Sequence, residues 1–286
     1  MRATTRLALL STSVALVATA VGATTAQAVD GGAGNITIDK VVVNGGKPVV
    51  VGTTKVVSVK VSVTASDDSG IAETTYISAF GPTPNYAQIW YDDGDITCVK
   101  VSATTSTCTG TLTFDPQAST GFVGNSAAGT WNLRTLVSAN DYDYIHRDAA
   151  TKFKVQRDSK LTANAAPEPV KKGKTVTVTG KLSRASWDDN KYHGYTGQPV
   201  KLQFRKKGSS TYTTVKTVKS NSTGNLKTTV TASTDGYYRY SFAGTTTTPA
   251  VNAAATSWTS GSHVLRASPG PDESRRLSHR GAVLTG

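Results

Sequence analysis

The run Val200-Lys-Leu-Gln-Phe-Arg205 is followed by Leu226-Lys-Thr-Thr-Val230 and by Tyr238-Arg-Tyr-Ser-Phe242. Apolar and polar residues alternate in all three runs, and this period of two is typical of a β-strand with one face on a core and the other in water. Clusters of Asn, Gly, Ser and Asp separate the runs, and such residues favour tight reversals of the chain. Residues 200–244 therefore predict four short antiparallel strands of a β-sandwich, and they contain no obvious reaction centre.

The first half of the chain carries the same signal. The valines of residues 57–63 alternate with polar residues, and residues 131–137 repeat the pattern. Turn signals such as Asn44-Gly45-Gly46 lie between these runs, and about seven short strands with this spacing favour an immunoglobulin-like sandwich over a barrel. Helical periodicity is nearly absent. We therefore predict an all-β protein with two tandem immunoglobulin-like β-sandwich domains.

Charge divides the chain into two parts. Residues 29–162 hold 11 basic and 13 acidic residues, a net charge of −2, whereas residues 163–260 hold 14 basic and 4 acidic residues, a net charge of +10. The two prolines of Pro167-Glu-Pro169 lie near the break, where they disfavour a helix or a central strand. We place the first domain at residues 29–158 and the basic second domain at residues 159–260.

Both termini differ in kind from the domains. Residues 1–28 combine two arginines, an apolar run over residues 7–21 and the small-x-small site Ala26-Gln27-Ala28, which together are typical of a secretory signal peptide. The apolar run is too short to span a bilayer comfortably, and no later run reaches about 18 apolar residues. We predict a secreted, extracellular protein with no transmembrane segment after cleavage. Residues 261–286 carry four arginines with prolines and no alternation, and we expect them to be disordered.

Two cysteines fit an oxidising compartment. Cys98 and Cys108 flank a segment that is strand-like at both ends and small and polar in the middle. A hairpin centred near Ala103 would place the sulfurs opposite each other, which favours a disulfide in a secreted protein. A metal site is a weaker alternative because no nearby His or Cys completes four ligands.

The second domain carries four characteristic pieces of sequence: residues 160–162 with 167–174, 197–200, 220–226 and 236–244. Through these pieces it resembles the Ig-like modules that end many secreted actinobacterial proteins. The first domain, through residues 67–71 and 129–141, is a looser match to bacterial Ig-like or cadherin-like modules. Proteins with this two-domain layout are often named calcium-binding, so the resemblance implies a Ca²⁺ site.

Three acidic turns of the first domain offer the oxygen ligands that Ca²⁺ prefers. Loops at one end of a sandwich can converge, so a shared site is geometrically possible. None of the turns matches the twelve-residue EF-hand loop, and Asp is also common in turns that hold no metal. The candidate ligands are Asp67, Asp68, Asp92, Asp93, Asp95, Asp141 and Asp143.

Basic residues of the second domain alternate with its apolar positions, and we expect them to form one positive sheet surface. Such a surface attracts polyanions, for example an anionic cell-wall polymer or another extracellular macromolecule. The alternative is a solvated positive face without a ligand. No motif indicates sequence-specific recognition of nucleic acid. The residues of this predicted surface are Lys201, Arg205, Lys206, Lys207, Lys216, Lys227 and Arg239.

Residues 184–195 read as an aromatic loop, which offers either a binding platform or a plug for one end of a sandwich, with Trp187 and Tyr195 as the plugging residues. No catalytic constellation accompanies it: the chain lacks Gly-x-Ser-x-Gly, His-Glu-x-x-His and a phosphate-binding loop. His146, near Asp141 and Asp143, is a weak acid–base candidate, because a lone His is more often structural. We therefore expect a non-enzymatic binding or scaffolding protein, with calcium binding as the alternative.

Overall fold

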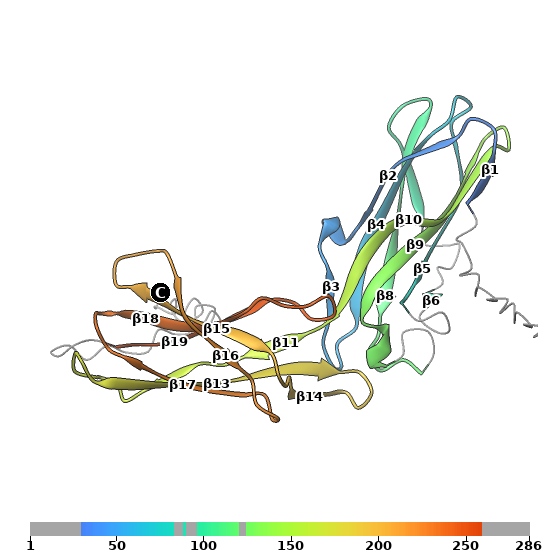
Figure 1. Cartoon of the computed structure of the whole chain (residues 1–286). Helices are drawn as coiled ribbons and strands as arrows, with labels where there is room; N and C mark the ends of the chain where they lie inside the picture. The colour runs from blue at the N-terminus through green and yellow to red at the C-terminus, as the bar shows by residue number, and fades with distance from the viewer. Residues whose placement is uncertain (1–29, 83–87, 90–95, 120–123, 259–286) are drawn as a thin grey trace, which may run out of the picture.

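A computed structural model describes residues 30–258 apart from 83–87, 90–95 and 120–123. Within these residues the chain is almost entirely β-structure, with two short 3-10 turns, Asn44–Gly46 and Asn125–Ala127, and no α-helix. Two sandwiches lie end to end and meet at an angle (Figure 1). None of the helical segments described has the length and apolar character needed to cross a membrane. The signal-peptide prediction and the disordered-tail prediction fall outside the described residues.

The first domain packs two sheets face to face. Within each sheet all neighbouring strands are antiparallel except one pair, in which β3 runs parallel to β10. One sheet contains β1 (Gly31–Ala33), β10 (Tyr144–Arg157), β9 (Gly129–Ala139), β5 (Ile71–Phe80), β6 (Gln88–Ile89) and β3 (Val49–Val51). The other contains β2 (Thr37–Val43), β4 (Val57–Ser66), β8 (Thr105–Phe114) and β7 (Thr97–Lys100).

The second domain repeats the architecture with antiparallel strands. The run 200–244, which predicted four strands, supplies β15 to β18, and these divide between the two sheets. One sheet contains β11 (Ser159–Leu161), β12 (Asn164–Ala166), β13 (Thr175–Ser186), β14 (Lys191–Gly194) and β17 (Asn225–Thr231). The other contains β16 (Thr213–Lys219), β15 (Pro199–Lys206), β18 (Gly236–Phe242) and β19 (Val251–Trp258). The tandem β-sandwich prediction is confirmed.

The alternating residues fill two separate cores. In the first domain the buried residues of β4 and β8 face Trp131 of β9, whose ring lies 5.4 Å from that of Phe114. In the second, Val178 of β13 and Leu202 of β15 are fully buried, and the hydroxyl of Tyr240 donates a 3.0 Å hydrogen bond to the Val178 carbonyl. Each domain therefore has its own apolar centre, as a β-sandwich requires.

The cysteine prediction is also confirmed. Cys98 of β7 and Cys108 of β8 are paired in register and joined by a disulfide. The segment 184–195 differs from its prediction as a loop, because β13 continues to Ser186 and β14 runs back beside it, so the segment is a β-hairpin with its turn at 187–190.

Candidate functional sites

Carboxylates gather at the end of the first domain that lies away from the second. Asp67 and Asp68 begin the β4–β5 turn, and Asp141 lies in the β9–β10 turn. Each of the three offers one oxygen atom, and these atoms all lie within 4.8 Å of one another. Two oxygens that bind one Ca²⁺ at about 2.4 Å are at most about 4.8 Å apart, so the spacing of the three carboxylates meets this condition for a shared ion.

Asp67 is the unusual member of this acidic cluster. Its side chain is only 4 % exposed. Oδ1 accepts hydrogen bonds from the amide (2.8 Å) and the hydroxyl (2.6 Å) of Ser69, whereas the buried Oδ2 has no hydrogen-bond partner among the described residues. A buried carboxylate oxygen without a donor destabilises a fold by about 1–3 kcal/mol or more. A bound cation would remove that cost.

Asp143 lies beside the cluster but is held differently. Its Oδ2 accepts a 2.7 Å hydrogen bond from the amide of Asn35, and its carboxylate fills the space that a side chain at Gly34 would occupy. The side-chain amide of Asn35 also donates a 3.0 Å hydrogen bond to Oδ2 of Asp68. The turns of the first domain thus converge as expected, with Asp143 acting as a brace for them. Asp92, Asp93 and Asp95, the third predicted loop, lie outside the described residues.

The tip of the β9–β10 hairpin carries an exposed aromatic residue. Tyr142 has 92 % of its surface exposed and a φ of 74°. The Tyr142 amide donates to the Ala139 carbonyl and the Ala139 amide donates to the Asp143 carbonyl, which closes a tight hairpin loop. A left-handed residue at this place in such a loop is usually Gly. Tyr142 therefore holds a conformation that costs energy while its ring contacts mostly solvent.

A second candidate region is the junction between the domains. Trp187, in the β13–β14 turn of the second domain, is 4 % exposed and packs in the core of the first domain. Its indole N–H donates to the carbonyl oxygens of Val51 (3.3 Å) and Gly52 (2.9 Å). Of the two roles predicted for the aromatic segment, binding platform or plug, Trp187 has the role of a plug. It closes the end of the first domain, although it belongs to the second. Tyr195 packs against Phe242 within its own domain.

Polar contacts surround this tryptophan. The Trp187 amide donates to Oδ1 of Asn125 at 2.9 Å, and Asp188 accepts a 2.8 Å bond from the Asn125 amide. The side-chain amide of Asn190 donates to the carbonyls of Thr53 and Pro116, each at 2.9 Å. Three of the four residues of the β13–β14 turn, Trp187, Asp188 and Asn190, therefore bind the first domain directly.

The β18–β19 connection makes a second set of contacts across the junction. Gln156 Nε2 donates to the Thr245 carbonyl at 2.9 Å, and the Arg157 amide donates to the Thr247 carbonyl at 3.0 Å. In Figure 1 this connection and the β13–β14 hairpin reach the end of the first domain as two separate prongs. Contacts from two prongs restrict both bending and rotation at the junction.

Burial at the junction shifts the ionisation of two groups. Desolvation, with the nearby charge of Arg184, lowers the pKa of Arg157 to about 10. Desolvation, together with the 2.7 Å hydrogen bond from its hydroxyl to Asp158, raises the pKa of Tyr192 above its usual value. In both groups, burial at the junction is the largest cause of the shift.

The predicted positive surface is divided by the structure. Lys201, Arg205 and Arg239 project from the outer side of the β16-β15-β18-β19 sheet, and Lys206 and Lys207 lie at the end of β15. Lys227 lies on β17, which belongs to the opposite sheet, and Lys216 pairs with the inward-facing Leu202. The single surface expected from alternation is therefore wrong, because β17 crosses to the other sheet.

The two arginines of that outer face, Arg205 and Arg239, already contact other side chains of the domain. The Arg205 guanidinium lies 4.4 Å from the ring centre of Tyr237, and that of Arg239 lies 3.8 Å from the ring centre of Tyr212. Arg239 also donates to Gln203 at 2.7 Å. Cation–π and hydrogen-bond partners thus reduce what these arginines can offer to a ligand.

His146 pairs with a different acid from the two considered above. Its Nε2 lies 3.0 Å from Oδ1 of Asp148, and Nε of Arg134 lies 2.6 Å from the same oxygen. The Arg134 guanidinium in turn stacks on Phe80 at 4.3 Å. The histidine therefore belongs to a polar cluster on the sheet face with Asp148 and Arg134, and neither Asp141 nor Asp143 is its partner.

Comparisons with known proteins return structures of low similarity. No family model matches the chain, and no curated protein matches it. The D00-D0 domain of intimin is 11 % identical with a TM-score of 0.27, over 77 % of this chain and 100 % of that one. Domains A168–A170 of titin are 12 % identical with a TM-score of 0.23, over 74 % and 60 %.

A protein of Corynebacterium diphtheriae described as membrane-anchored is 12 % identical with a TM-score of 0.25, over 73 % of this chain and 52 % of that one. TM-scores this low carry no argument about function, so the fold rests on the sheets themselves.

Proposed function

We propose that the protein is an extracellular, non-enzymatic binding or scaffolding protein whose two domains form one stiff arm. The observation that carries this proposal is the insertion of Trp187 of the second domain into the core of the first. Domains joined only by a flexible linker keep separate cores and move independently. Here a core residue and two prongs tie them, so the far end of one domain is held at a fixed place relative to the other.

The extracellular location is supported by the disulfide and by the signal-peptide features of residues 1–28. A stiff arm outside the cell suits the presentation of a binding surface at a distance from its attachment.

Residual dipolar couplings measured on both domains test the arm. One alignment tensor should fit both domains of the unmodified protein, and Trp187→Ala should require two. Tyr142→Ala, which removes an exposed aromatic ring at the other end of the first domain, serves as the matched control and should keep one tensor. Two independent tensors for the unmodified protein would contradict the proposal.

A second candidate function is calcium binding by Asp67, Asp68 and Asp141. It is favoured by the buried Asp67 Oδ2, which has no donor in the part of the chain that the structure describes, in a group of carboxylates whose oxygens lie within 4.8 Å of one another. The three carboxylates would supply part of the six to eight oxygens that Ca²⁺ takes, and water the remainder. Bound calcium would lock the distal turns together and neutralise their negative charge.

Calcium titration followed by melting temperature tests this function. At a concentration 100 times its dissociation constant, Ca²⁺ adds about 2.7 kcal/mol to the free energy of unfolding. Asp67→Asn should abolish the rise in melting temperature, whereas Asp189→Asn, an exposed acid in the β13–β14 turn, should preserve it. The absence of any rise at millimolar Ca²⁺ would exclude the function, and the test of the arm would be unaffected.

A further inference from the structure

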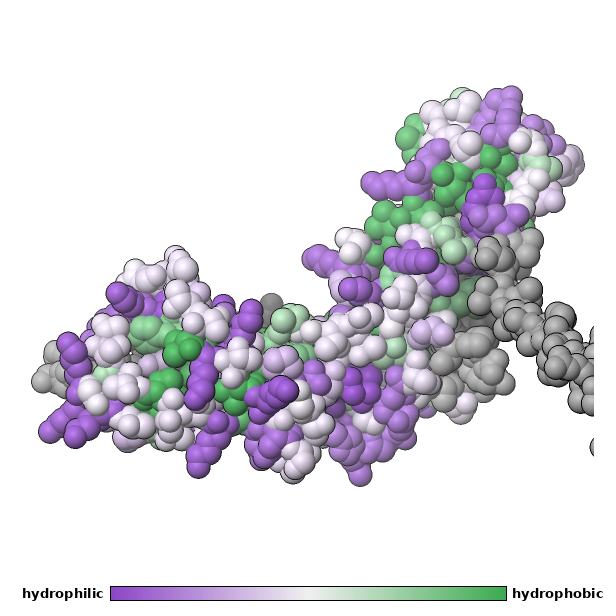
Figure 2. Space-filling view, in the orientation of Figure 1, coloured by the Kyte–Doolittle hydropathy of each residue, from purple (hydrophilic) through white to green (hydrophobic). Residues whose placement is uncertain are grey.

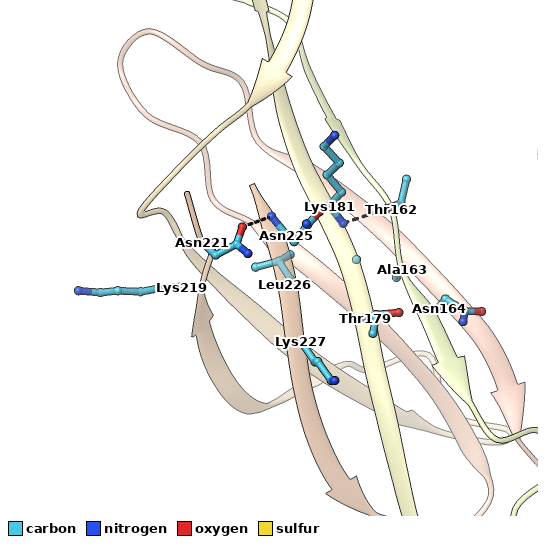
Figure 3. A pocket seen from close by; sticks show the side chains of 11 residues that line it. Thr162, Ala163, Asn164, Thr179, Lys181, Lys219, Asn221, Asn225, Leu226 and Lys227 are labelled. Carbon is cyan, nitrogen blue, oxygen red and sulfur yellow. Dashed lines mark hydrogen bonds between the residues drawn. The ribbon is translucent and has the colours of Figure 1, made fainter. Parts of the chain in front are cut away.

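A pocket of about 690 Å³ opens on the outer face of the second domain (Figure 3). The connection 162–163 between β11 and β12, with Asn164 at the start of β12, forms one wall, and the turn that follows β16 forms another. The connection can approach β13 because residue 180 is Gly: a Cβ there would lie 2.2 Å from the Thr162 carbonyl oxygen. Thr162 Oγ1 also accepts a 2.9 Å hydrogen bond from the Lys181 amide. The wall is therefore fixed by the fold.

Three exposed lysines surround this pocket. Lys227 pairs with Thr179 and Lys181 pairs with Asn225 on adjacent strands, so both lysines project from the same outer face. Lys219 ends β16 on a third side, and Figure 3 shows the three at different edges of the pocket. None of them makes an ion pair within the part of the chain that the structure describes. Their charges are thus available to a ligand.

Amide groups lie between the lysines. Asn221 Oδ1 accepts a 2.8 Å hydrogen bond from the Asn225 amide, whereas the Asn221 side-chain nitrogen donates to no described residue. The side chain of Asn164 likewise has no hydrogen bond within the described residues. No aromatic side chain lines the pocket, so bases or sugar rings find no stacking surface there. The free groups suit hydroxyls and separated negative charges.

The wider surface agrees with this reading. On the face seen in Figure 2, hydrophilic and neutral residues cover most of the second domain, and hydrophobic residues show as narrow strips. The net charge of residues 163–260 is +10, which attracts polyanions at long range. The other sheet has arginines that are already engaged by Tyr212 and Tyr237. Lysines without an ion pair in the described residues also lie on or beside the other sheet, at Lys201, Lys206 and Lys207. The three at the pocket differ from these because a cavity and two amide side chains lie between them.

We propose that Lys181, Lys219 and Lys227 form a binding site for a hydroxyl-rich polymer with repeated negative charges, such as an acidic polysaccharide or a polyol phosphate. Charges at three edges suit an extended chain with separated anionic groups better than one small anion. The Asn164 and Asn221 amides would donate to hydroxyls between those groups. The site shares no residue with the acidic cluster or with the junction between the domains. The result of its test therefore leaves the proposals of calcium binding and of a stiff arm unaffected.

Calorimetric titration at 20 mM and 150 mM NaCl tests the site with polygalacturonate, poly(glycerol phosphate) and uncharged dextran as probes. One or both charged polymers should bind, and the one that binds more tightly indicates whether the site prefers carboxylate or phosphate groups. Binding should weaken as the salt concentration rises, because the polymer releases counterions when it binds. The triple variant Lys181→Gln, Lys219→Gln and Lys227→Gln should lose about tenfold or more in affinity.

A matched triple variant removes the same charge elsewhere: Lys201→Gln, Lys206→Gln and Lys207→Gln should lose less than about threefold. All six lysines are exposed, so both variants should fold, which melting temperature checks. Polyacrylate, which has charges but no hydroxyls, tests the role of the two amides. The unmodified protein should bind the preferred hydroxyl-bearing polymer more tightly than polyacrylate, and the double variant Asn164→Ala with Asn221→Ala should reduce this ratio of affinities. Equal losses in the two triple variants, no binding of either charged polymer at 20 mM NaCl, or tighter binding of oligo-dT would overturn the proposal.

Discussion

The indole nitrogen of Trp187, a residue of the second domain, donates a 2.9 Å hydrogen bond to the carbonyl oxygen of Gly52 in the first. The ring belongs to the apolar core of the first domain and is 4 % exposed. The first sandwich is therefore completed by a side chain that lies outside its own stretch of sequence, and its stability depends on its neighbour.

Trp187→Ala should destabilise the first domain, although the substitution lies in the second. Truncation of a buried Trp leaves a cavity and costs about 3–5 kcal/mol in the free energy of unfolding. Urea denaturation followed by amide signals from each domain measures where the loss occurs. Trp187→Phe keeps much of the packing and should cost less. A loss seen in the second domain alone would contradict the shared core.

Tyr142→Gly should stabilise the protein. The tyrosine has a φ of 74°, which costs a residue with a Cβ about 1 kcal/mol and costs Gly little. Removal of an exposed ring loses little packing, so the free energy of unfolding should rise by a few tenths to about 1 kcal/mol. Chemical denaturation measures the change. Tyr144→Gly, within strand β10, should destabilise instead, and a loss for Tyr142→Gly would indicate that the ring has contacts that support the hairpin.

Alkaline pH should separate the unmodified protein from Tyr192→Phe. Burial and the Asp158 hydrogen bond raise the pKa of Tyr192 in the folded state, so above about pH 10 the unfolded chain loses this proton while the folded protein keeps it. Unfolding is then favoured as pH rises. Tyr192→Phe lacks this proton, so the stability difference between the two proteins at pH 8 should shrink by pH 11.

Two other groups titrate in that range and are common to both proteins. Burial raises the pKa of Tyr240 to about 12, which has the same sign as Tyr192. The pKa of Arg157, lowered to about 10, has the opposite sign because the folded state loses its proton first. Comparison of the two proteins cancels both effects. Urea denaturation at each pH measures the difference, and a constant difference from pH 8 to pH 11 would refute the assignment to Tyr192.

Removal of the disulfide should weaken the β7–β8 hairpin. Cys98 and Cys108 are 10 residues apart, and a loop of this length gives about 2–3 kcal/mol in the chain-entropy model. The double variant Cys98→Ala with Cys108→Ala should lose that amount in free energy of unfolding. Reduction of the unmodified protein with dithiothreitol should give a loss of similar size. An unchanged midpoint under both conditions would contradict a stabilising role.

Local patterns predicted the strands well because alternation is a property of each strand alone. The valines of β4 and the residues of β15 and β18 all bury the faces that their period of two indicates. The pairing of Cys98 with Cys108 was likewise a short-range inference across one hairpin. These features need no knowledge of which sheet a strand joins.

Long-range arrangement was beyond such reasoning. Alternation predicted that Lys227 lies on an outer face, but it could not indicate which of the two sheets carries that face. The sequence likewise suggested that Trp187 plugs a sandwich without indicating which domain it enters. The fit of Asp188 beside Gly124, where a Cβ would lie 2.8 Å from Asp188 Oδ1, depends on residues 64 positions apart. Asp67 and Asp141 could be proposed together only because loops of a sandwich converge at one end.

The fixed junction has a consequence for the charge of the whole molecule. Residues 29–162 carry a net charge of −2 and residues 163–260 a net charge of +10, and the carboxylates of Asp67, Asp68 and Asp141 lie at the end farthest from the basic domain. In the stiff arm proposed above, this asymmetry would be a permanent electric dipole along the molecule. In the field of a negatively charged surface such an arm would turn its second domain inward and hold the acidic turns of the first domain outward.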